Sequence, residues 1–389
     1  QSVVMGLLTA FVGFSSSFAV VLHGIQAAGA SDAQAASGLM ALSVAMGLCG
    51  IVLSLWKRMP ISIAWSTPGA AFLATIGTVE GGFPVVVGAF VISGLLIVAA
   101  GLFRPLSRAI SAIPAALANA MLAGVLVSLC FAPVKAVAFN PWLGLPIIVA
   151  YFAGGALNRL LAVPAALIAF VLVVILGVEI DPVALAHVGD ALMPVPVFVW
   201  PQFTVATLVS IALPLFIITM ASQNIPGITV LKVNGYDPPP GPLFAATGLF
   251  SLLSAPFGGH AVNLAAITAA MCAGEDAHAD PKRRYWAAVI AGVVYVILGL
   301  LAGAVTAAVA LAPKILIEAV AGLALIAAFS GSAMSAFKEA ETREAAAITF
   351  IVTASGLSFG GVSGAFWGLL AGGAVMALAK WTRHRNRAK

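Results

Sequence analysis

The chain has 389 residues, of which 62% are hydrophobic and 8% are charged, and its formal net charge is +5. Because a soluble protein of this length carries roughly a quarter charged residues, the composition excludes a soluble globular protein and predicts a polytopic, all-α membrane protein. The basic residues lie in short loops between apolar stretches, so we interpret them as topology signals and expect no nucleic-acid partner. Three cysteines in apolar stretches, without a C-x-x-C motif, indicate neither a metal site nor a disulfide framework.

Apolar windows of ~20 residues predict the segments that cross the membrane. In chain order, the predicted continuous helices lie at about residues 3–28, 33–56, 81–103, 109–134, 136–158, 160–178, 203–225, 285–313 and 315–335. Residues 345–379 are predicted to hold two further short spans, broken near Ser355–Ser363 by glycine and serine. Acidic residues and prolines predict an extramembrane connection at residues 179–201.

Two other windows are predicted to contain interrupted segments. Residues 59–79 include Trp65-Ser66-Thr67-Pro68-Gly69, which would interrupt a straight helix and predicts an extended piece followed by a half-helix from about Gly69. The window 238–274 is too long for one span, so it is predicted to hold a short helix, a break at Pro256–Gly259 and a half-helix from about His260. With these, the predicted total is 14 membrane segments.

The distribution of basic residues tests this count. With the N-terminus in the cytoplasm, 16 of the 18 lysines and arginines fall on the cytoplasmic side, and Lys135 and Lys314 fall outside. This asymmetry agrees with the positive-inside rule. Both termini are therefore predicted to be cytoplasmic, with a basic tail at residues 381–389.

The two halves of the chain are predicted to form an inverted repeat. The stretch TPGAAFLA at Thr67–Ala74 aligns with GGHAVNLA at Gly258–Ala265, at an offset of 191 residues. Each half then holds seven spans, and because seven is odd the second half is inverted relative to the first. Interrupted segments at matching positions of two halves are typical of a transporter's substrate site.

Polar side chains gather with helix breakers at Ser222-Gln223-Asn224 and at Gly258-Gly259-His260, the second followed by Asn263. Polar groups at membrane depth are costly and indicate a functional site. The spans contain almost no acids or bases, so His260 is predicted to bind the coupling proton and substrate; the alternative is a histidine that only bonds a neighbouring helix. His23 has no such polar surroundings, so for this residue the alternative is expected, a histidine that only bonds a neighbouring helix.

The half-helix N-termini at Gly69 and Ala70 and at His260 are expected to face each other and to attract an anion. Beside them, Gly259 and Asn263 complete the second cluster. The amides of Gln223 and Asn224 can donate to a carboxylate, with a polar helix cap at the membrane surface as the alternative.

Three further side chains are candidates for contact with substrate. Ser16 and Ser17 lie among phenylalanines in the first helix, and Phe72 lies one turn into the first half-helix. Small hydroxyls beside phenyl rings suit an aromatic anion. The alternative for the serines is close helix packing or bonding to their own helix carbonyls, and for Phe72 it is core packing.

The run SQNIPGITVLKVNGYDPPP at Ser222–Pro240, followed by APFGGHAVNLAAITAAM at Ala255–Met271, resembles the bacterial benzoate:proton symporter family. The resemblance extends over essentially the whole chain, including FVGFSSSFAVVLHG and AWSTPGAAFL. That family is similar in fold to nucleobase and sulfate/anion transporters. The resemblance implies a 7+7 inverted repeat in which segments 3 and 10 are half-helices preceded by short strands, with substrate bound between them.

The resemblance also implies a division into two domains. A core domain would comprise residues 1–104 (segments 1–4) and 202–313 (segments 8–11). A gate domain would comprise residues 105–178 (segments 5–7) and 314–380 (segments 12–14), and residues 179–201 would connect the halves. The family further implies a place in the bacterial inner membrane, contact with membrane lipid, and a homodimer as one arrangement seen in this fold group.

Nucleobase transporters place glutamates where the matching motifs here have Gln223 and His260. The loss of two negative charges favours an anionic ligand, so the predicted function is symport of benzoate or a related aromatic carboxylate with protons, by alternating access. The alternatives are a nucleobase or a small inorganic anion carried on the same fold, and a channel. A membrane-embedded enzyme would need a nucleophile–base pair or a metal cluster, and the sequence shows neither, so no enzyme activity and no cofactor are expected.

Overall fold

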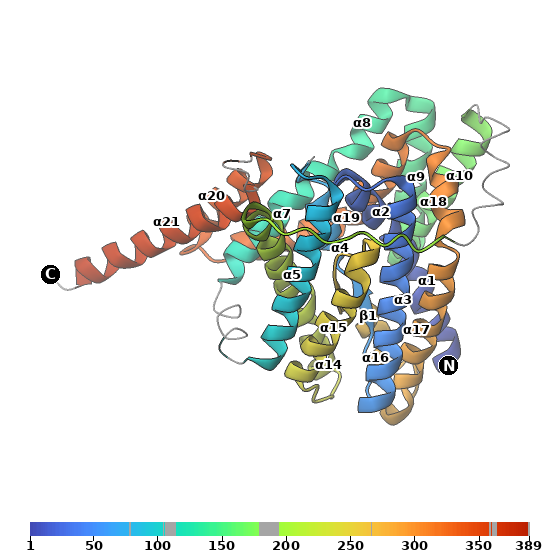
Figure 1. Ribbon diagram of the computed structural model, residues 1–389, viewed down its shortest axis with the longest axis horizontal. Coiled ribbons are helices and arrows are strands. Elements are labelled where there is room, and N and C mark those ends of the chain that lie inside the picture. The colour runs from blue at the N-terminus through green and yellow to red at the C-terminus, as the bar shows by residue number, and fades with distance from the viewer. Residues whose placement is uncertain are drawn as a thin grey trace.

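The structure is a computed structural model that describes residues 1–77, 79–103, 105, 114–178, 194–265, 267–357, 359 and 364–387. The described chain is mostly helical and holds one two-stranded sheet (Figure 1). Most of the predicted connection at residues 179–201, part of the predicted break near Ser355–Ser363 and the end of the basic tail lie outside the described residues.

Seven helical stretches in the described part of the chain are long and apolar enough to cross a membrane. They are Ser2–Ala27, Asp32–Lys57, Phe83–Leu102, Ala115–Phe139, Val205–Val233, Pro281–Leu300 and Lys314–Phe337. Three shorter apolar helices are Pro141–Leu157, Ala162–Gly177 and Gly364–Ala379. The prediction of a polytopic α-helical membrane protein is thereby confirmed.

The individual helices are numbered as in Figure 1. Those of the first half are α1 (Ser2–Ser15), α2 (Phe18–Ala27), α3 (Asp32–Lys57), α4 (Thr67–Leu73), α5 (Phe83–Leu102), α7 (Ala115–Cys130), α8 (Ala132–Phe139), α9 (Pro141–Leu157) and α10 (Ala162–Gly177). Those of the second half are α12 (Val205–Thr207), α13 (Leu213–Thr219), α14 (Ile225–Val233), α15 (Pro240–Ser254), α16 (Ile267–Ala273), α17 (Tyr285–Leu300), α18 (Ala302–Ala310), α19 (Lys314–Phe337), α20 (Arg343–Ala354) and α21 (Gly364–Arg387). The helix predicted at residues 285–313 is therefore two helices, because the chain leaves helical geometry at Leu301.

Local sequence signals set the ends of α3. The Ser31 hydroxyl accepts a hydrogen bond from the Gln34 backbone N–H, and the Gln34 side chain accepts one from the Ser31 N–H. This capping box satisfies two of the free N–H groups of the first turn. Asp32 in the first turn and Lys57 in the last both have the sign that the helix dipole favours.

The helices pack in two groups. In the first group α3 lies against α17 and α15, α5 against α15, and α1 against α17. In the second group α7 lies against α19 and α20, α9 against α10, α8 against α19, and α20 against α21, which projects from the body toward the C-terminus (Figure 1). The groups meet where α2 contacts α19 and where α4 contacts α7.

Glycines allow the closest approaches within the first group. A Cβ atom at Gly47 of α3 would lie 2.5 Å from the backbone oxygen of Gly292 on α17, and a Cβ at Gly24 of α2 would overlap the carbonyl of Ala70 on α4. Without a hydrophobic force between helices in lipid, such close backbone contact supplies much of the association energy. The Gly24 contact fixes the position of α4 against α2.

The sheet is formed by two short strands that are far apart in sequence. Strand β1 (Ile63–Trp65) pairs antiparallel with β2 (Val262–Leu264), and Ala64 lies opposite Asn263. Each strand leads into a helix of seven residues, β1 into α4 and β2 into α16. Because the sheet is antiparallel, the two strand–helix units run in opposite directions from one crossing point.

The prediction that a half-helix begins at about His260 is wrong. Gly258 ends the preceding helical turn with a φ of 91°, a conformation that glycine adopts without strain. The following residues form β2, and α16 begins only at Ile267. The predicted alignment of Thr67–Ala74 with Gly258–Ala265 is therefore out of register. Strand β1 matches β2, and α4 matches α16, only at an offset larger than the predicted 191 residues.

Candidate functional site

The β1–β2 crossing, by which we mean the point where these two strands pair, lies in the interior of the molecule. Trp65 on β1 is 2% exposed and Val262 on β2 is fully buried. Helices α13, α14 and α15 and the π-helical turn η3 (Met220–Asn224) surround the crossing through contacts with α4 or β2. All polar groups at this point are removed from bulk water, so each needs a hydrogen-bond partner from protein, ligand or bound water.

Asn224 is buried at the end of the π-helical turn and holds β2 in place. Its side-chain oxygen accepts a hydrogen bond of 2.9 Å from the backbone N–H of Leu264, and its amide nitrogen lies 3.2 Å from the sulfur of Met220. Asn224 is therefore not a surface helix cap, which was the alternative considered from the sequence. Its hydrogen-bonding capacity is largely used by the fold.

Gln223 precedes Asn224 but, unlike Asn224, is not held by hydrogen bonds of its side chain. Its side chain is half-buried and makes no hydrogen bond to any residue that the structure describes. The extra residue of a π-turn redirects neighbouring side chains, and such turns are frequent at functional sites. Of the two adjacent amides, Asn224 therefore has a structural role, and Gln223 is free to bind a ligand.

His260 is completely buried on the segment that leads into β2. Its Nδ1 atom accepts a hydrogen bond of 2.6 Å from the backbone N–H of Ala261, and its ring stands edge-on to Phe90 of α5 at 6.2 Å. A neutral imidazole whose Nδ1 accepts carries its proton on Nε2. The Nε2 atom has no partner among the described residues, so it is a buried donor that the fold does not use.

Asn263, three residues further, is also completely buried. Its amide nitrogen makes a long hydrogen bond of 3.4 Å to the carbonyl of Ala64 across the sheet, and its side-chain oxygen has no partner among the described residues. An unpaired buried polar atom costs about 1–3 kcal/mol. The segment from His260 to Asn263 therefore carries one unused donor and one unused acceptor; no hydrogen bond joins the two side chains.

The N-terminus of α4 is already capped by the protein. The Gly69 N–H donates to the Ser66 hydroxyl at 3.2 Å, and the Ala70 N–H donates to the Ser66 carbonyl at 2.8 Å. Thr219 of α13 donates to the same Ser66 hydroxyl at 3.0 Å. The two N–H groups predicted to attract an anion are thus not free, because the serine that precedes the helix satisfies them first.

The serines of the first helix support β1. The Ser17 hydroxyl lies 3.2 Å from the Gly13 carbonyl and accepts a 2.8 Å hydrogen bond from the Trp65 indole. The Ser16 hydroxyl donates to the same carbonyl at 3.2 Å, as the alternative of bonding within the helix anticipated. Phe72 on α4 is fully buried in the hydrophobic core.

The sequence reasoning missed Glu318. This acid lies four residues into α19, within a helix long enough to span the membrane, and its carboxylate is 3.7 Å from Nδ1 of His23 on α2. His23 thus contacts a side chain of a neighbouring helix, in agreement with the role expected for it. The available signal was a carboxylate inside the apolar window that starts after Lys314.

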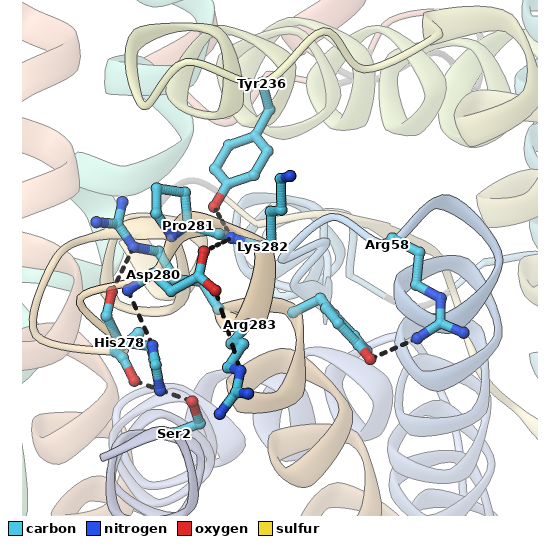
Figure 2. Close-up of polar contacts among 11 residues, drawn as sticks. Ser2, Arg58, Tyr236, His278, Asp280, Pro281, Lys282 and Arg283 are labelled. Atoms are coloured by element: carbon cyan, nitrogen blue, oxygen red, sulfur yellow. Dashed lines mark hydrogen bonds and ion pairs between the residues drawn. The ribbon is translucent and has the colours of Figure 1, made fainter.

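The loops at the N-terminal end of α17 form a second polar region. The hydroxyl of Tyr236 donates to the carbonyl of Pro281, and Arg58 donates to the hydroxyl of Tyr285 at 2.6 Å (Figure 2). Arg58, predicted only as a topology signal, thus also ties the end of α3 to α17, while Tyr236 ties the loop after α14 to Pro281. A cavity of about 790 Å³ opens beside them, lined by Arg58, His278 and Lys282 among others.

Comparison with known proteins gives matches along nearly the full length of the chain. The sequence pattern of the family described as Benzoate membrane transport protein matches residues 1–378. An Inner membrane protein YdcO of Escherichia coli K12 is 39% identical over 382 residues, which cover 98% of this chain and 96% of that protein. A Benzoate membrane transport protein of Acinetobacter baylyi is 31% identical over 377 residues, which cover 96% of this chain and 93% of that protein.

Among solved structures, the transmembrane domain of a cyanobacterial bicarbonate transporter, BicA, matches with a TM-score of 0.56. The match covers 97% of this chain and 95% of that chain, at 14% sequence identity. At this level of identity the likeness establishes a shared fold. It does not establish a shared substrate.

Proposed function

The chain belongs to the benzoate membrane transport protein family, and from that premise we propose that it imports benzoate or a related aromatic carboxylate together with protons. The chain is a multi-pass transporter of the bacterial inner membrane and not an enzyme. The substrate and the coupling to protons are the proposal. A relative that is 31% identical carries the name of a benzoate transporter, which supports the substrate class.

The observation that carries the proposal is the pair of unused polar atoms on the segment from His260 to Asn263. The Nε2–H of His260 is a buried donor without a partner, and the side-chain oxygen of Asn263 is a buried acceptor without a partner. A carboxylate needs a donor, and a carboxyl group that carries a proton needs an acceptor as well. No carboxylate of the described protein bonds these two residues, so a negative ligand meets no direct repulsion there.

The proton is assigned to His260 in this proposal. Burial leaves a charged imidazole without compensation, so the proton is proposed to bind His260 together with the carboxylate, whose negative charge stabilises the imidazolium. A protonated His260 would form a charge-assisted hydrogen bond with the carboxylate, and loss of the proton would weaken that bond and release the substrate. Import of one monoanion with one proton moves no net charge across the membrane.

Alternating access is proposed to arise from movement of the two helix groups relative to each other. The first group contains helices predicted for the core domain (residues 1–104 and 202–313), and the second contains helices predicted for the gate domain (residues 105–178 and 314–380). The antiparallel pairing of two strand–helix units supports the proposed inverted repeat of 7+7 segments. The cytoplasmic location of both termini is proposed from the distribution of basic residues. This mechanism operates within one chain, so it is compatible with a lipid-bound monomer and with a homodimer.

A second candidate is transport of a small inorganic anion on the same fold. The observation that favours it is the structural likeness to the bicarbonate transporter. A nucleobase is disfavoured because Gln223 and His260 replace the acids that would accept its N–H groups.

Uptake competition in proteoliposomes separates these candidates. Unlabelled benzoate is expected to compete with labelled benzoate, whereas bicarbonate, sulfate and uracil are expected to leave its uptake unchanged. Protein-free liposomes serve as the control for passive diffusion of benzoic acid. Uptake of labelled benzoate that does not exceed the protein-free control, or that bicarbonate or uracil inhibits as strongly as benzoate does, would overturn the proposed substrate.

A further inference from the structure

A second cavity lies where the two helix groups meet, away from the β1–β2 crossing. Its volume is about 270 Å³, and its lining combines the end of α4 with α7, α8, α19 and α20. The polar residues that line it include Thr75, Ser128, Lys135, Glu318 and Thr353. A space of this size admits several waters or one small organic acid.

One polar group in this cavity is left unused by the fold. Thr353 on α20 is 6% exposed, and its hydroxyl has no hydrogen-bond partner among the described residues. By contrast, the Thr75 hydroxyl donates to the Phe72 carbonyl and the Ser128 hydroxyl donates to the Val125 carbonyl. A buried hydroxyl that lines a cavity without a partner indicates a ligand or bound water at that point.

The charges around the cavity have opposite signs. Lys135 on α8 provides an ammonium group that can attract an anion, while Glu318 on α19 provides a carboxylate that would repel one. The carboxylate of Glu318 is paired at 3.7 Å with His23, whose side chain is 20% exposed. Lys314, one turn before Glu318, adds a positive charge near the same histidine.

We propose that this cavity is a loading site for the aromatic monocarboxylate, in which Lys135 and Thr353 bind the carboxylate and the His23–Glu318 pair takes up the accompanying proton before it passes to His260. The site rests on the proposed function and is distinct from the β1–β2 crossing. Without the proton, a neutral His23 and an ionised Glu318 sum to one negative charge, which repels the substrate. With the proton, the pair is neutral overall and the repulsion is removed.

The position of the pair links loading to the transport movement. His23 lies on α2 in the first helix group and Glu318 on α19 in the second. Any separation of the two groups changes the distance between these side chains. The proton is therefore held between the two parts that move, next to the cavity through which the substrate passes on its way to His260.

The test is the apparent KM for benzoate uptake into proteoliposomes, measured between about pH 5 and pH 8, where benzoate, with a carboxyl pKa near 4, stays mostly ionised. Lys135→Gln is expected to raise KM about two- to fivefold, the range of an exposed charge pair, and Lys135→Arg is expected to restore it. Glu318→Gln has the opposite expected effect: KM at about pH 8 falls to the value measured in acid and loses its pH dependence.

Two further variants make the outcome specific. The control, Glu80→Gln in an exposed loop outside the cavity lining, is expected to leave KM unchanged. Thr353→Val tests the hydroxyl proposed to bind the carboxylate, with little change of side-chain volume. If wild-type KM varies with pH but Lys135→Gln and Glu318→Gln keep wild-type values, the loading site is wrong and the proposed function stands. If wild-type protein does not carry benzoate but carries another anion, the proposed function fails, and the same variants then test the cavity with that anion.

Discussion

At the scale of single residues, the fold separates polar groups that it uses from polar groups that it leaves free. Asn224 and Ser66 have their oxygen atoms bonded to backbone N–H groups of the β1–β2 region. His260 and Asn263 each keep one buried atom without a partner among the described residues. The free atoms are the ones we assign to substrate, because a buried donor or acceptor without a partner is costly to maintain.

His260→Ala is expected to abolish proton-driven benzoate uptake while the protein remains folded. A hydrogen bond to a charged group contributes about 1.5–3 kcal/mol, so we expect affinity for benzoate to fall roughly tenfold to a hundredfold. Binding by calorimetry and a size-exclusion profile measure the two effects. Near-normal accumulation in this variant would remove His260 from the mechanism.

Gln223→Ala and Asn224→Ala form a matched pair of neighbouring amides. Asn224→Ala leaves the Leu264 N–H without its partner, so we expect a loss of stability of about 1–3 kcal/mol, seen as a lower melting temperature. Gln223→Ala removes a side chain without a described hydrogen bond and is expected to weaken benzoate binding at unchanged melting temperature. Equal effects of both variants on stability and affinity would contradict this division.

At residue scale, the sequence was sufficient to select the polar segments but not the role of each side chain. Composition alone made Gln223, Asn224 and His260 conspicuous, because polar groups are rare in this chain. It could not show that Asn224 faces the Leu264 N–H, since that contact joins residues 40 positions apart. The pair of His23 and Glu318 was missed for the same reason, as its members are distant in sequence and each looks isolated there.

At the scale of secondary-structure elements, the central feature is two strand–helix units that meet in one antiparallel sheet. The prolines and glycines at Trp65–Gly69 and at Pro256–Gly259 predicted both interruptions. The register of the second was wrong because consecutive glycines can begin a helix or leave one. Here Gly258 leaves a helical turn in the left-handed region, and the chain needs a strand before α16 can begin.

Ser66→Ala tests whether the N-terminus of α4 is a structural cap or a substrate site. The change frees the Gly69 N–H and removes the acceptor for Thr219. Loss of an N-cap costs about 1 kcal/mol, so thermal stability should fall while benzoate affinity is kept or rises. Retained stability with lost affinity would show instead that Ser66 itself contacts the substrate.

At the scale of the whole molecule, two groups of helices meet at a limited set of contacts. The joining contacts include those of α2 with α19, of α4 with α7 and of α1 with α10. The sequence predicted the membrane class and the approximate positions of the seven long apolar helices, because apolar length is a local property. Packing between the groups depends on contacts between distant segments, so it could be expected only through the family resemblance.

Linking the two groups is expected to stop transport. Thr75, just after α4, and Ser128 on α7 line the same cavity from different groups. With Cys49, Cys130 and Cys272 replaced by alanine, Thr75→Cys together with Ser128→Cys should lose benzoate uptake on treatment with a thiol-reactive crosslinker that contains a disulfide. A reductant should restore the uptake, and each single cysteine variant should be insensitive. Full uptake by the crosslinked protein would exclude relative movement at this contact.

The central claim is that the protein binds an aromatic carboxylate together with a proton, and one calorimetric measurement tests it most directly. Benzoate is titrated into purified protein in buffers of different ionisation enthalpy, between about pH 6 and pH 8, and the dependence of the heat on the buffer gives the protons taken up per benzoate bound. We predict saturable binding with net proton uptake, which His260→Ala abolishes along with most of the affinity. Absence of benzoate binding, or binding without proton uptake at every pH, would contradict the account.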